Sequence, residues 1–207
     1  MKNFIALIVS VMLVLLLLLG YSTNVNSELS QNIVRLHVIA NSDTKEDQEL
    51  KLKVRDAILE HSEKDFTQKS DVTNQLETYK EIAQNVISEN GFDYNADVEY
   101  GNFHFPTKHY TGISLPAGSY DAVRIKIGDA KGRNWWCVMF PPLCFVDGTT
   151  NAAYAEEKLK STLGTDSYDI ITSSKSGSFP FEIKFKIVEI CGKLAKKDKV
   201  YATARKD

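Results

Sequence analysis

"SYDAVRIKIGDAKGRNWWCVMF", residues 119–140, contains two apolar runs separated by a polar turn with two glycines. The first run alternates between apolar and other residues, so one face of a strand carries Val123, Ile125 and Ile127. The second run indicates another strand, in which Trp135 and Trp136 point to opposite faces. Because the turn between them is short, we expect the two strands to pair directly as a hairpin.

A strand followed by a helix is predicted upstream of this pair. "IVRLHVIA" (33–40) is rich in β-branched residues, and Arg35 and His37 share the strand face opposite its Val and Leu side chains. The following stretch, 41–62, favours a helix that Asp43 caps, since Glu46 stands three residues later. The apolar face of this helix consists of Leu50, Val54, Ala57, Ile58 and His61.

The remaining pattern completes an α+β domain. Its predicted elements are a helix from about residue 71 to the "ENG" stop, a strand at 97–105, a loop at 106–118, a helix at 150–164, a loop at 172–178 and a helix from about residue 182. The last segment also fits a strand, although we favour the helix. We therefore expect a single domain over 33–195, with an antiparallel or mixed sheet packed against helices.

The two ends of the chain differ from this domain in composition. Lys2 precedes an uncharged apolar run, so residues 1–22 indicate an export signal or a retained membrane anchor, followed by a linker at 23–32. The basic tail, 196–207, suits either contact with an anionic membrane surface or, as we favour, a frayed solvated end. The net charge of −2 gives no reason to expect nucleic acid as a partner.

The cysteines allow two interpretations. Cys137 and Cys144 lie close enough in the chain to form a disulfide across the expected hairpin, which export would permit. Alternatively, both are small apolar residues of a core strand. Cys191 falls in the helix predicted from residue 182.

The sequence offers no convincing catalytic or metal site. Ser42 and Lys45 have the spacing of a serine acyltransferase pair, but the companion motifs are absent and Ser42 and Asp43 are ordinary helix-capping residues. His104 and His109 have no acidic or thiol companion nearby. We therefore expect no enzyme activity, no metal, no cofactor and no small-molecule substrate.

A surface for recognition is the remaining candidate. Phe140 is followed by Pro141 and Pro142, which end strand pairing and stiffen the chain. One of the two tryptophans would enter the core and the other would be available to a partner, making 135–144 an apolar contact tip. The alternative is a buried central strand with a rigid exit.

Three segments together resemble one protein family. They are the apolar amino-terminal run, residues 33–59 with "RLHVIANSD", and residues 115–147 with "NWWCVMFPPLC". In this order they are similar to stage II sporulation protein R of endospore-forming bacteria. The resemblance implies a messenger that the forespore exports into the space between the two septal membranes. There it would trigger a membrane-embedded aspartic protease of the mother cell, which cuts the pro-sequence from inactive sigma-E.

Two patches are our candidates for contact with that protease. The first surrounds the turn after the first strand and consists of Arg35, His37, Asn41, Asp43, Asp47, Arg55 and Asp56. The second is the tip with Trp135, Trp136, Phe140, Pro141 and Pro142. The charged residues of the first patch would equally suit an internal network of ion pairs and caps. The competing functions are a secreted cell-wall or peptide hydrolase and a passive envelope-binding protein.

Overall fold

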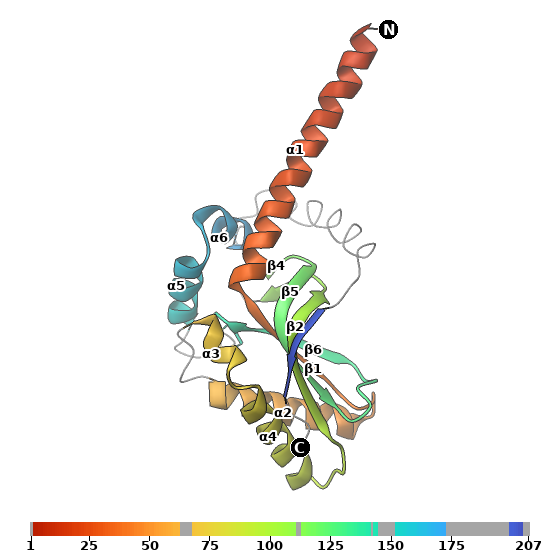
Figure 1. The fold of residues 1–207 in the computed structure, drawn as a ribbon, viewed down its shortest axis with the longest axis vertical. Coiled ribbons are helices and arrows are strands. Elements are labelled where there is room, and N and C mark those ends of the chain that lie inside the picture. The colour runs from red at the N-terminus through yellow and green to blue at the C-terminus, as the bar shows by residue number, and fades with distance from the viewer. Residues whose placement is uncertain are drawn as a thin grey trace.

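A five-stranded mixed sheet forms the centre of the molecule (Figure 1). The computed structural model describes residues 2–62, 68–110, 113–141, 143–144, 152–172 and 199–204. The strands follow the order β6 (Asn134–Phe140), β1 (Val34–Ile39), β5 (Gly118–Ile127), β2 (Ala96–Phe105) and β7 (Lys199–Thr203). β1 runs parallel to β5, whereas β1–β6, β2–β5 and β2–β7 are antiparallel pairs. With helices packed on the sheet, the predicted α+β class with a mixed sheet is confirmed.

β5 and β6 do not pair with each other, because β1 lies between them. The predicted hairpin is therefore wrong. Leu36 of β1 lies opposite Val123 on one side and Cys137 on the other. The connection at 128–133 thus spans two strand spacings, about 10 Å, instead of one. A turn of this length and polarity suits either arrangement, so the local sequence does not distinguish them.

The 128–133 connection crosses the carboxyl end of β1 and is bonded to it. The amide of Lys131 donates to the carbonyl of Asn41 at 3.0 Å, and the amide of Gly132 donates to the carbonyl of Ala40 at 2.9 Å. A side chain at position 132 would collide with the backbone carbonyl of Ser42. Gly132 is therefore required by the close approach of two backbones.

The helices α2 (Lys45–Ser62), α3 (Lys69–Thr73) and α4 (Leu76–Glu89) cover one face of the sheet. The helix predicted from residue 71 is interrupted, and α3 and α4 share its apolar pattern. The predicted apolar face of α2 is largely confirmed, although His61 is exposed. The main side chains of this first core include Val34, Leu36, Val38, Leu50, Val54, Ile58, Val72, Tyr79, Ile87, Val123, Ile125 and Ile127.

A second core lies on the opposite face. It is covered by the last turns of α1 (Lys2–Asn32), by the small ribbon of β3 (Lys108–Tyr110) and β4 (Ile113–Leu115), and by α5 (Ala152–Thr162) and α6 (Thr165–Thr172). We predicted 106–118 as a loop, and the β3–β4 ribbon corrects this. The predicted helix ending at Gly164 is confirmed as α5. Buried side chains here include Leu29, Ile33, Phe103, Phe105, Leu115, Tyr120, Val138, Leu159 and Ile171.

α1 continues as a helix through residues 23–32, which we predicted as a linker. Leu29 is fully buried in the second core, and the carboxylate of Glu28 accepts hydrogen bonds from the Gly164 amide at 2.6 Å and the Ser167 hydroxyl at 2.5 Å. The other end of α1 extends away from the sheet, with described apolar side chains exposed, Leu17 by 66% (Figure 1). Among the described residues, no helix meets the length and apolarity needed to cross a membrane.

The basic tail contains an ordered strand where we expected a frayed end. β7 pairs with β2, and Ala204 is buried with its amide bonded to the Val98 carbonyl at 2.8 Å. The helix predicted from residue 182, the loop after Thr172 and Cys191 lie outside the described residues.

Replacing Gly132 with alanine is expected to destabilise the domain by about 1–3 kcal/mol, since the backbones at 132 and 42 must separate to admit a methyl group. Urea unfolding of the variant and the wild type measures this difference. Lys131→Ala, at an exposed neighbouring position, serves as control and should change the free energy of unfolding by less than about 0.5 kcal/mol. If Gly132→Ala were as stable as the wild type, the backbones at residues 132 and 42 would not lie as close as the structure places them.

Candidate functional site

The turn from β1 into α2 is built around the carboxylate of Asp47, which is 3% exposed. Its Oδ2 accepts hydrogen bonds from the Asn41 side-chain amide at 2.9 Å and from the Ser42 hydroxyl at 2.5 Å. The backbone amide of Asp47 donates to Thr44 Oγ1 at 3.3 Å, so Thr44 caps the helix. The predicted cap, Asp43, is therefore wrong by one residue.

The hydrogen bonds set the ionisation of Asp47. Burial works to raise the pKa of this carboxyl, but bonds from Ser42, Asn41, Tyr94 and Thr44 together outweigh it. The pKa of Asp47 consequently lies below its ordinary value, and the folded state favours the charged form. Asp47 is an anionic anchor for the turn and is not exposed to a partner.

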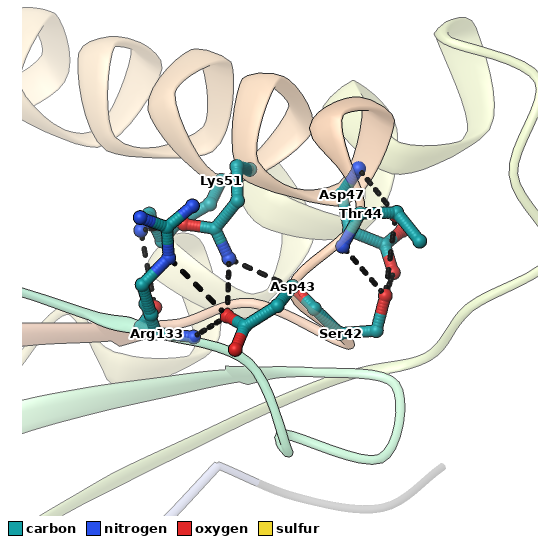
Figure 2. Close-up of polar contacts among 7 residues, drawn as sticks. Ser42, Asp43, Thr44, Asp47, Lys51 and Arg133 are labelled. Atoms are coloured by element: carbon teal, nitrogen blue, oxygen red, sulfur yellow. Dashed lines mark hydrogen bonds and ion pairs between the residues drawn. The ribbon is translucent and has the colours of Figure 1, made fainter.

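Asp43 connects the same turn to the 128–133 connection, as Figure 2 shows. Its Oδ1 accepts a 2.7 Å hydrogen bond from the backbone amide of Arg133 and lies 3.4 Å from the Arg133 Nε. Lys51, which is 5% exposed, donates to the Arg133 carbonyl at 3.0 Å and to Gln48 Oε1 at 2.6 Å. Burial, aided by the charge of Arg133, lowers the pKa of Lys51. The turn after β1 and the connection above it therefore form one bonded unit.

The Ser42–Lys45 pair has no catalytic arrangement. The Ser42 hydroxyl is directed to Asp47, whereas the Lys45 ammonium pairs with Glu49 at 3.7 Å on the exposed side of α2. Among the described residues, no group of three His, Cys, Asp or Glu side chains is placed to hold a metal. His109 Nδ1 lies 2.8 Å from the Ser114 hydroxyl within the β3–β4 ribbon.

Arg35 and His37 lie on the predicted face of β1, but this face is buried in the second core. Arg35 is 0% exposed; its Nη2 donates to the Tyr110 hydroxyl at 2.9 Å, and its guanidinium carbon lies 4.3 Å from the Phe105 ring centroid. His37 Nε2 lies 2.8 Å from Asn134 Oδ1, and the imidazole stacks on Trp136 with ring centroids 3.8 Å apart. Neither residue belongs to the surface around the turn.

Arg55 and Asp56 form a separate group on α2. The Arg55 Nη2 lies 2.6 Å from Asp56 Oδ1, and the guanidinium carbon lies 4.9 Å from the Trp135 ring centroid. The Asp56 side chain is 62% exposed and Trp135 is half-buried. We call Arg55, Asp56 and Trp135 the α2–β6 surface group. Of the first predicted patch, Arg55 contacts Trp135 of the second, and Asp56 pairs with Arg55.

Most of the described part of the predicted tip is interior. Trp135 and Trp136 do point to opposite faces, and each is half-buried against a different core. Phe140 and Pro141 are buried, whereas Pro142 lies outside the described residues. Cys137 and Cys144 are joined by a disulfide with Cα atoms 5.6 Å apart. It ties β6 to the chain that returns after Pro141, where the amides of Leu143 and Cys144 bond to the Val138 carbonyl. The structure therefore has the disulfide that was one of our two interpretations of these cysteines.

Sequence reasoning missed Gln48, Lys51 and Arg133, which complete the bonded unit. Lys51 lies on the apolar side of α2, three residues before Val54 and seven before Ile58. In the sequence it resembles an ordinary surface lysine. Only the crossing of the connection over β1 brings the Arg133 carbonyl to it. Its role therefore could not be inferred from helical spacing.

Together these observations define an α+β domain whose polar turns are bonded to each other and which exposes a tryptophan beside an ion pair. The family model of stage II sporulation protein R matches residues 30–150, which is more than half of the sequence. The chain belongs to the stage II sporulation protein R family. It is 37% identical over 134 residues to stage II sporulation protein R of Bacillus subtilis (strain 168).

That alignment covers 61% of this chain and 60% of the Bacillus relative. The relative is named for sporulation and its name states no enzyme activity. No solved structure matches the chain. The family match includes both the turn after β1 and the whole of β6, the segments that the structure places side by side.

Replacing Asp47 with asparagine is expected to lower the free energy of unfolding by about 1–3 kcal/mol at pH 7, because charge-assisted hydrogen bonds are lost. A carboxyl whose pKa is lowered by folding stabilises the native state above its unfolded pKa, near 4, and this contribution disappears as the pH falls through the folded value. The difference in the free energy of unfolding between wild type and Asp47→Asn should therefore become smaller as the pH falls from 5 to 2.

Chemical denaturation at each pH measures that difference. Asp129→Asn is the matched control, since Asp129 is 68% exposed and pairs with the exposed Lys131. If the difference in the free energy of unfolding between wild type and Asp47→Asn stays constant from pH 5 to pH 2, ionisation of the Asp47 carboxyl does not stabilise the fold.

Proposed function

We propose that the chain is an exported signalling protein of endospore formation. In this proposal it activates a membrane-embedded protease, and that protease removes the pro-sequence of sigma-E in the mother cell. Membership of the stage II sporulation protein R family carries the proposal, since it assigns a role in sporulation. The protein acts by binding, and it has no catalytic task of its own.

The amino-terminal arm supports export. Its apolar side chains follow Lys2 and are exposed along α1, an arrangement that water disfavours and an export pathway or a lipid bilayer accommodates. Export across the cytoplasmic membrane places the domain in the space between the septal membranes, either released or still anchored. The disulfide between Cys137 and Cys144 fits such an oxidising location.

Activation requires that the domain bind the active arrangement of the protease more tightly than the inactive one. The α2–β6 surface group is the best-supported contact among our predicted residues. It combines a half-buried tryptophan with an arginine stacked on it, and both residue types are enriched among those that dominate binding energy. Asn41, Asp43 and Asp47 serve this surface indirectly, because they hold the turn that positions α2 on β6.

Introducing a charge into the apolar arm is expected to abolish signalling. Leu13→Arg adds a cost of about 2.5–3.5 kcal/mol to membrane insertion, so export should fail. Co-expression with the septal protease and pro-sigma-E, read as the fraction of sigma-E processed, measures the effect. Leu13→Ile is the control, and replacing residues 1–22 of the arginine variant with another export signal should restore processing. Full processing by a non-exported variant, or without this protein, would contradict the proposal.

Reversing the charge of Asp56 is expected to reduce processing about tenfold or more, since Asp56→Lys places two like charges beside Trp135. The same assay, with the protein level and thermal midpoint recorded, provides the measurement. Glu49→Lys makes the same change of charge at a 59% exposed position of α2 and should process normally. If Asp56→Lys and Glu49→Lys process sigma-E equally well, the α2–β6 surface group does not contact the protease.

A further inference from the structure

β6 is an edge strand of an unusual composition. Among the strands that the structure describes it pairs with β1 alone, and its sequence "NWWCVMF" contains no charged residue and no proline. Exposed edges are normally protected by charges, proline or bulges, because their free backbone groups attract other strands. The opposite edge, β7, begins with Lys199. The pairing of β1 with β6 shifts register between Val34 and Arg35, opposite the end of β6. Residues 134–137, which precede this shift, therefore lack the charges, proline and bulge that prevent strand addition.

The direction of one carbonyl shows which backbone groups of β6 point outward. The Val138 carbonyl accepts hydrogen bonds from the amides of Leu143 and Cys144, at 3.2 and 3.3 Å, so it is turned away from β1. Backbone groups alternate in direction along a strand, so those of Trp136 and Asn134 also face outward, while those of Trp135 face β1. Within the described chain, the backbone groups of Trp136 and Asn134 have no hydrogen-bond partner on that side.

Only the first half of β6 is open. Leu143 and Cys144 occupy the edge at Val138, and from Cys137 onward the side chains are buried. By contrast, Asn134 is exposed and the two tryptophans are half-buried. The tryptophans flank the open edge on its two faces, Trp135 beneath Arg55 and Trp136 stacked on His37. An added strand would find backbone partners along the edge and an aromatic surface on either side.

We propose that residues 134–137 of β6 bind an extended segment of the partner protein, which joins the sheet as an additional strand. An extended polypeptide is the occupant whose donors and acceptors match those of Asn134 and Trp136, since both strands repeat every two residues, about 6.7 Å. The added strand would lie about 4.8 Å from β6. Its contacting residues lack proline, because the edge is read through backbone N–H and C=O groups, and they pack on the two tryptophans. The inference rests on the proposed function for the identity of the partner, the protease that processes pro-sigma-E.

An amide-to-ester replacement tests this without altering a side chain. Cell-free synthesis of the full chain with the hydroxy acid of tryptophan at position 136 removes one outward N–H, which is unpaired in the free domain. Because the ester also makes the Trp135 carbonyl, which faces β1, a weaker acceptor, the unfolding midpoint should fall slightly. The affinity for the detergent-solubilised protease should fall about five- to tenfold. The same ester at position 135 is the matched control. It removes an N–H directed at β1 and should lower the unfolding midpoint.

The outcomes separate the two proposals. If wild-type protein neither binds nor activates the protease, the proposed function fails. If wild type binds and the 136 ester binds equally well, the edge inference is overturned. An unfolding midpoint that falls as far for the 136 ester as for the 135 ester would also overturn it, since the 136 N–H would then be used within the fold. Light scattering that shows a wild-type dimer lost in the 136 ester would assign the edge to a second copy of the chain instead.

Discussion

The insertion of β1 between β5 and β6 is the constraint on which the rest of the structure depends. It makes β1 a central strand, whose two faces lie under the two cores, so Arg35 and His37 become interior residues although their sequence positions resemble a polar face. It also forces the 128–133 connection across the end of β1, where its backbone approaches that of Ser42. The two segments that carry the family resemblance are thereby made neighbours.

The polar residues of the molecule divide into those that hold the fold and those that face outward. Asp43, Asp47 and Lys51 are committed to hydrogen bonds across the turn and the connection. Asp56 and the half-buried tryptophans remain at the surface. Removing one charged partner from an internal hydrogen-bond network destabilises the fold. If a substitution of Asp47 abolishes function, the cause is therefore a distorted turn and not the loss of a direct contact with the protease.

The sequence predicted individual elements better than their arrangement. A β-branched apolar run located β1, and the glycine stop at Gly164 helped to locate α5. Alternation located β2 and β5, and three- and four-residue spacing located α2 and α4, because these periods follow from local geometry. Pairing β6 with β1 instead of β5 is a long-range choice that no local pattern encodes. The same limit applies to the site: the spacing indicated a capped turn at residues 42–47, but Arg133 and Lys51 reach it only through the crossing. The helix through 23–32 was missed because its few apolar residues pack through tertiary contacts.

The docking of the last turns of α1 restricts how the amino-terminal arm can be removed. Glu28 bonds to the first turn of α6, and Leu29 and Ile33 fill the second core. A peptidase that cuts at or before residue 26 leaves these contacts whole and sets free a complete domain. One that cuts beyond Leu29 would open the second core to water. If the arm is removed after export, cleavage between the end of the apolar segment and residue 26 is the position that would leave the domain complete.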